Sequence, residues 1–183
     1  KQDIAIRVLV DHIRAVAFAI ADGQMPSNTG AGYVIRRILR RAVRYAYSFL
    51  DVREPIMFGL SEVLIAEMGP FFKGLESNKT LITQVVKEEE ESFLRTLSKG
   101  IDLIDGIISE TKSDVIPGKV AFELYDTFGF PEDLTQLIAS EQNYTIDKKG
   151  FEAALQRQKE GSRKDAAKEM GDWNILNDVE VGG

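Results

Sequence analysis

Several residue types are scarce in this chain, and their scarcity excludes whole classes of chemistry. None of the 183 residues is cysteine, which excludes disulfides, thiolate metal sites and a cysteine nucleophile. His12 is the only histidine, so no pair of histidines can hold zinc. No apolar run approaches the roughly 18 residues of a membrane span, and the N-terminus lacks a secretory signal. We therefore expect a cytoplasmic protein with no metal site and no membrane contact.

The charge of the chain is distributed unevenly. The net charge is −6, although hydrophobic residues make up 44% of the sequence, as in a folded domain. Residues 1–50 contain eight Lys or Arg and three Asp or Glu, a net charge of +5. Residues 51–183 contain 15 Lys or Arg and 26 Asp or Glu, a net charge of −11. Because screening confines each field to about 8 to 10 Å, a basic segment on an acidic body can still bind a polyanion.

Apolar residues recur at helical spacing, and no sustained period-two alternation appears. The fold is therefore predicted to be all-α, an irregular multi-helix domain with one long helix and one basic helix. Turn-forming residues and a predicted N-cap at Asp147 separate the elements. Helices are expected over residues 3–21, 33–50, 56–68, 76–109, 131–143 and 148–171, with a short helix ending at about Asp126. We assign residues 1–171 to one domain and residues 172–183 to a tail or linker.

Two helices carry specific expectations about burial. In the first, the predicted core residues are Ile4, Val8, Ile13, Val16 and Ile20. In the long helix they are Leu81, Val85, Phe93, Leu97, Ile101, Ile104 and Ile108. The run Lys87–Glu91 within the long helix has the composition of a solvated outer face rather than of a metal site.

The helix over residues 33–50 separates arginine from apolar side chains. On a wheel of 100° per residue, five arginines fall within about 140° and the aliphatic residues occupy the opposite arc. No acidic residue interrupts them, whereas a merely soluble face usually mixes both signs. The face therefore favours an anionic partner. The arginines are Arg36, Arg37, Arg40, Arg41 and Arg44.

Several longer strings resemble those of one family. The segments DHIRA (11–15), ADGQMPSN (21–28) and GYVIRRILRRAVR (32–44) are similar to alanyl-tRNA synthetases, as are LYDTFGFP (124–131) and DLT (133–135). The strings occur in the family's order and extend over nearly all of the chain. One departure is Ala31, where the family's Gly-Arg-Gly-Tyr string has arginine.

The resemblance implies a part of a larger enzyme. In this family an ATP- and Mg-dependent class II catalytic domain precedes a helical tRNA-recognition domain, and a zinc-binding editing domain follows it. The chain corresponds to the recognition domain, so we expect no cofactor and no catalytic residue in it. Its partners would be the acceptor stem of alanine tRNA and the catalytic and editing domains. The parent would be an alanine–tRNA ligase, a translation enzyme.

The resemblance also assigns roles to individual residues. The family reads a G:U wobble pair, and the matching positions are Asn28 and Asp126. By the same comparison, the five arginines would position the stem through phosphate contacts rather than read bases. Without the resemblance, Asn28 suits a turn and Asp126 suits a helix end.

Two other functions remain open from the residues alone. The chain could be a helical module that binds nucleic acid without sequence preference, through the arginine helix only. Alternatively, it could be a protein-interaction scaffold whose arginines bind a partner protein or the acidic residues of the chain itself.

Overall fold

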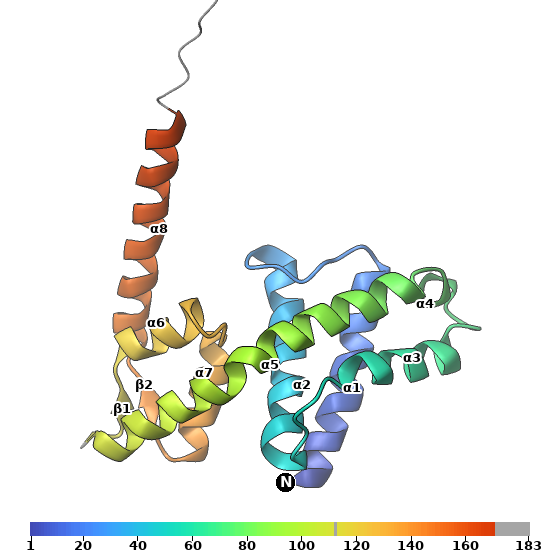
Figure 1. The fold of residues 1–183 in the computed structure, drawn as a ribbon, viewed down its shortest axis with the longest axis horizontal. Coiled ribbons are helices and arrows are strands. Elements are labelled where there is room, and N and C mark those ends of the chain that lie inside the picture. The colour runs from blue at the N-terminus through green and yellow to red at the C-terminus, as the bar shows by residue number, and fades with distance from the viewer. Residues whose placement is uncertain (112, 171–183) are drawn as a thin grey trace, which may run out of the picture.

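Two helices near the N-terminus, α1 (Gln2–Ala21) and α2 (Gly30–Leu50), pack closely against each other. The computed structural model describes residues 1–111 and 113–170 (Figure 1). The buried stripe of α1 runs through Ala5 and Leu9 to Ile20, whereas Ile4 is 57% exposed, so the expectation for Ile4 was wrong. Alanine at position 5 continues the regular spacing of the buried face, which the larger isoleucine beside it obscures in the sequence.

The long helix α5 (Lys79–Glu110) crosses over this pair, as Figure 1 shows, and α3 (Met57–Met68) packs beneath it. The expected single helix from residue 76 is instead two, because α4 (Lys73–Ser77) ends before Asn78. The side-chain Nδ2 and the backbone N–H of Asn78 both donate to the carbonyl oxygen of Gly74, at 2.9 and 3.2 Å, so the side chain shares the acceptor of the helical bond. The predicted core residue Leu81 is 38% exposed, and Ile82 is buried in its place.

The acidic run on α5 is a solvated face only in part, since Lys87 and Glu88 are exposed as expected but Glu90 is not. Glu90 is 1% exposed, and its carboxylate accepts hydrogen bonds from the backbone N–H groups of Ile56, Met57 and Phe58 at 2.8 to 3.3 Å. It thus caps the N-terminus of α3, where an anion is favourable. Burial raises the pKa of Glu90, although these N–H bonds act in the opposite direction.

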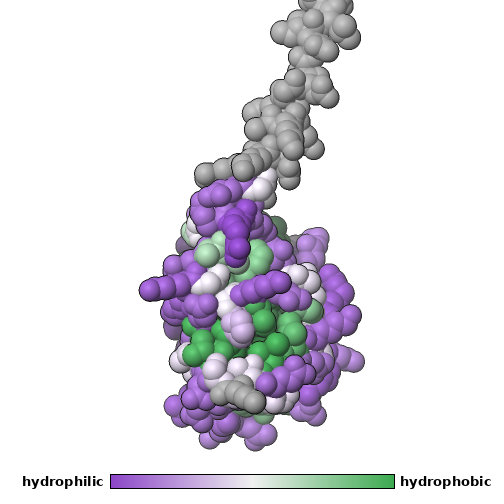
Figure 2. All heavy atoms as spheres, turned by 90° about the vertical axis from the view of Figure 1, so that its left-hand side faces the viewer, coloured by the Kyte–Doolittle hydropathy of each residue, from purple (hydrophilic) through white to green (hydrophobic). Residues whose placement is uncertain are grey.

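The C-terminal lobe comprises β1 (Val115–Ile116), α6 (Gly118–Asp126), α7 (Glu132–Glu141), β2 (Thr145–Ile146) and α8 (Lys148–Met170). The strands pair in parallel over two residues each, too few for a period-two pattern. Asp147 caps α8 as predicted, accepting from the N–H of Gly150 at 3.0 Å. Figure 2 views this end of the molecule and shows apolar surface gathered at its centre within a hydrophilic ring.

The described helices confirm the all-α prediction, apart from the two short strands. The predicted tail, residues 172–183, lies outside the described residues. Within the described part of the chain, no helix is both long and apolar enough to traverse a bilayer.

Phe130 joins the C-terminal lobe to α5. Its ring is fully buried and meets Phe93 edge-on, with the ring centroids 5.4 Å apart. The ring also lies against Gly100, where an added Cβ would come within 2.3 Å of it. Thr96 donates a further hydrogen bond from α5 to the carbonyl oxygen of Phe128 at 2.8 Å. These contacts fix the turn that follows α6, and with it the end of α6.

Candidate nucleic-acid interface

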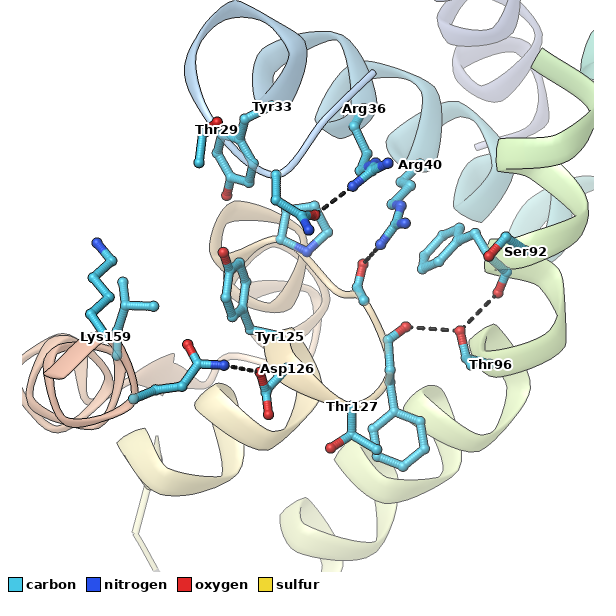
Figure 3. A pocket seen from close by; sticks show the side chains of 17 residues that line it. Thr29, Tyr33, Arg36, Arg40, Ser92, Thr96, Tyr125, Asp126, Thr127 and Lys159 are labelled. Carbon is cyan, nitrogen blue, oxygen red and sulfur yellow. Dashed lines mark hydrogen bonds between the residues drawn. The ribbon is translucent and has the colours of Figure 1, made fainter. Parts of the chain in front are cut away.

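A cavity of about 480 Å³ lies where four parts of the chain converge (Figure 3). One wall is the loop before α2 with the first turns of that helix, and the others are α5, the end of α6 with its following turn, and α8. Polar side chains from all four parts line it. They include Asn28, Thr29, Tyr33, Arg36, Arg40, Ser92, Thr96, Tyr125, Asp126, Gln158 and Lys159.

The loop before α2 is held tightly against the helix start. Gly32 is the close contact, because an added Cβ would lie 2.2 Å from the carbonyl oxygen of Met25. Gly30 begins the helix with a φ of 58°, a conformation that glycine adopts without strain. These glycines start α2 three residues earlier than predicted. Ala31, between them, is exposed.

The side chain of Arg36 on α2 holds Asn28 in place. Nη1 of Arg36 donates to Oδ1 of Asn28 at 2.5 Å. The rest of the same guanidinium binds Glu89 of α5 in a two-point contact, with Nε–Oε2 at 3.0 Å and Nη2–Oε1 at 2.5 Å. Arg36 therefore ties Asn28 to α5, and the amide nitrogen of Asn28 is the group that remains for a ligand.

Asp126 ends α6 and is exposed at the same cavity. Gln158 of α8 donates to its Oδ1 from Nε2 (Figure 3). The turn after Asp126 uses Gly129 at a φ of 70°, and the N–H of Phe130 donates back to the carbonyl oxygen of Leu124 at 2.9 Å. Asn28 and Asp126, 98 positions apart in the sequence, thus line one cavity.

The five arginines of α2 form two rows. The first row, Arg36, Arg40 and Arg44, has side chains that are 19%, 14% and 5% exposed. Arg40 donates to the carbonyl oxygen of Gly129 and lies 3.5 Å from Glu89, and burial lowers its pKa. Arg44 binds both carboxylate oxygens of Glu141 at 2.8 and 2.5 Å.

The second row, Arg37 and Arg41, is 41% and 38% exposed. Both approach a single carboxylate oxygen, Oδ2 of Asp133 on α7, at 3.7 and 2.7 Å. The other oxygen, Oδ1, is buried and has no hydrogen-bond partner among the described atoms. Burial and the negative charge of Asp133 raise the pKa of the neighbouring Tyr33.

The sequence left open that the arginines bind acidic residues of the chain itself, but it did not identify those residues. The absence of acidic residues within the arginine arc pointed outside the chain for an anion, yet each of the five arginines has a carboxylate partner from α5 or α7. The net charge of −11 over residues 51–183 was the one feature of the sequence that pointed to such partners within the chain. Tyr125 and Gln158 were also not predicted from the sequence as site residues, because their place at the cavity depends on the packing of α6 and α8.

Comparison with known proteins supplies the family. A family model described as "tRNA synthetases class II (A)" matches residues 1–181. The alanine–tRNA ligase of Flavobacterium psychrophilum is 58% identical over 176 residues, which is 96% of this chain and 20% of that protein. Those of Christiangramia forsetii and Porphyromonas gingivalis are 56% and 57% identical, over 98% and 97% of this chain and 21% of each relative.

The chain thus spans about a fifth of the length of these curated relatives. The match includes every part of the chain that lines the cavity. The resemblance predicted from the sequence is confirmed, and the chain belongs to the class II (A) tRNA synthetase family.

Proposed function

We propose that this chain is the part of an alanine–tRNA ligase that binds the acceptor stem of alanine tRNA and reads its G:U pair. The observation that carries the proposal is the shared cavity of Asn28 and Asp126. A G:U pair leaves the 2-amino group of guanine without its usual partner in the wide, shallow minor groove of an A-form stem. The carboxylate of Asp126 is an acceptor for that amine, and the amide of Asn28 can donate to the uracil edge.

Phosphate binding fits the second row of arginines best. Arg37 and Arg41 are the more exposed side chains, and they share a single carboxylate oxygen, so a phosphate can replace part of that contact. Arg36 and Arg40 line the cavity, where they support the loop and the turn that carry the two readers. Arg44, at 5% exposure, suits a structural ion pair better than a phosphate contact.

The complete enzyme would join alanine to the tRNA with ATP and Mg in a catalytic domain outside this chain. A zinc site does not fit the described residues, because the chain has no cysteine and no three histidine or acidic side chains converge within residues 1–111 and 113–170. We therefore assign no catalytic step to this chain. The editing and catalytic domains would be its partners within the ligase.

The test compares two acceptor-stem RNA duplexes that differ only in one pair, G:U or G:C. Asp126→Ala in the complete ligase should weaken binding of the G:U duplex by about 1 to 3 kcal/mol and barely change binding of the G:C duplex. Asp105→Ala is the matched control, because Asp105 also accepts a glutamine hydrogen bond, at 2.8 Å, but lies outside the cavity lining. Equal losses on both duplexes would make Asp126 a structural helix end.

A module without sequence preference is the main competing function. Competition between alanine tRNA and random duplex RNA at fixed salt separates the two, since such a module would bind both equally. The ion pairs of the arginines also agree with a scaffold in which these residues hold the fold together. A scaffold of that kind would bind neither RNA.

A further inference from the structure

Gln158, which the sequence resemblance does not assign, reaches the cavity from α8. Its Nε2 donates to Oδ1 of Asp126, and both residues line the cavity. We propose that Gln158 is a positioning residue that sets the carboxylate of Asp126 for recognition of the G:U pair. This inference rests on the function proposed above.

Packing at the base of α8 fixes where Gln158 lies. Gly118 of α6 meets Gly150 and Phe151 of α8 so closely that a Cβ on Gly118 would lie 2.3 Å from the backbone nitrogen of Phe151. The ring of Phe151 meets that of Tyr125 edge-on, with centroids 5.8 Å apart. Helix α8 therefore leaves this contact in a defined direction along α6.

Helical spacing then carries the contact to the cavity. Phe151, Leu155 and Gln158 are separated by four and three residues, so they lie on one face of α8. Phe151 is buried against α6, and Leu155 lines the cavity together with Gln158. Because this face of α8 packs on α6, Gln158 lies beside Asp126, the last residue of α6.

The hydrogen bond matches what a reading carboxylate requires. Asp126 stands at the C-terminal end of α6, where the helix dipole disfavours a negative charge, and a donor offsets that effect. The amide of Gln158 occupies Oδ1 and restricts rotation of the side chain, which leaves Oδ2 for the amine of guanine. A carboxylate that is already oriented loses less side-chain freedom when RNA binds, which amounts to about a two- to tenfold gain in affinity.

Asp105 and Gln142 provide a matched pair for the experiment. Nε2 of Gln142, the residue that follows α7, donates to Oδ1 of Asp105 on α5 at 2.8 Å; both side chains are exposed, and neither residue lines the cavity. Gln142→Ala therefore breaks the same kind of bond at a place where RNA reading is not proposed.

The variants Gln158→Ala, Gln158→Glu and Gln142→Ala are made in the complete ligase, and binding of the G:U and G:C duplexes is measured for each. Gln158→Ala should weaken G:U binding about two- to tenfold and G:C binding less than twofold, with unchanged thermal unfolding. Gln158→Glu should weaken G:U binding further, because it sets two carboxylates side by side. Gln142→Ala should change neither.

Two results would overturn the inference. If Gln158→Ala weakens both duplexes equally, or neither, while Asp126→Ala still removes the preference for G:U, the function stands and Gln158 does not position the reader. If Asp126→Ala leaves the preference intact, the proposed function fails and the inference fails with it.

Discussion

The two rows of arginines on α2 differ in almost everything except residue type. Arg36, Arg40 and Arg44 are spaced by four residues, point toward α5 and α7 and are mostly buried in two-point or multiple contacts. Arg37 and Arg41, one position further along, share one oxygen of Asp133 and stay near two-fifths exposed. One hundred degrees of helix rotation thus separates arginines that hold the fold from arginines that a ligand can reach.

The largest expected difference between the rows is in stability. Arg44→Ala should lower the free energy of unfolding by about 3 kcal/mol, because it removes a side chain that is only 5% exposed and leaves Glu141 without its partner. Arg41→Ala should cost less than about 1 kcal/mol, since solvent screens its contact. Urea unfolding of both variants measures the difference. Equal losses would remove the distinction between the rows.

The next effect concerns salt. If Arg37 and Arg41 contact phosphates, the double variant Arg37→Ala/Arg41→Ala should reduce the slope of log affinity against log salt by about 1.4 to 1.8 for an acceptor-stem duplex. Arg7→Ala/Arg14→Ala removes the same charge from exposed positions on α1 and serves as the control. A slope that changes as much in the control would show that only overall charge matters.

The smallest effect is a pH dependence at His12. Burial, and secondarily the charge of Arg41, lowers the pKa of His12 below 6.5, while Asp11 acts in the opposite direction. The unfolded chain therefore binds this proton more readily than the folded one, so the stabilisation is complete above about pH 6.5 and is lost as the pH falls. His12→Gln should flatten that dependence.

Nuclear magnetic resonance titration of His12, the only histidine, gives its pKa directly. Arg41→Ala should bring the pKa nearer to 6.5, because it removes a nearby cation. Arg44→Lys, which keeps its charge on the other row, is the comparison. A pKa that stays unchanged in Arg41→Ala would leave burial as the whole cause.

Periodicity predicted the helices because each buries an apolar stripe, and the errors arose where a polar group decided the outcome. The break at Asn78 coincides with a side-chain hydrogen bond to the carbonyl oxygen of Gly74. Glu90 is buried because it meets the free N–H groups at the start of α3, more than thirty residues away. Neither contact leaves a trace in the hydrophobic pattern, which explains why Glu90 was predicted to lie on the solvated face that Lys87 and Glu88 do form.

The candidate site followed from the family resemblance rather than from physical pattern. Nothing in the spacing of Asn28 and Asp126 indicates that they line one cavity, since that depends on how the turn around Phe130 joins α5. The basic face of α2 was visible from composition. Its division into two rows was not, because the acids Glu89, Asp133 and Glu141 come from distant elements.

Glycine at position 100 limits which residues evolution or engineering can place there. The ring of Phe130 fills the space that any larger residue there would occupy, and the same turn carries Asp126 at its other end. A methyl group introduced at position 100 of α5 would therefore force the ring of Phe130 to move. Glycine at position 100 is therefore one of the residues that allow the turn after α6 to pack on α5.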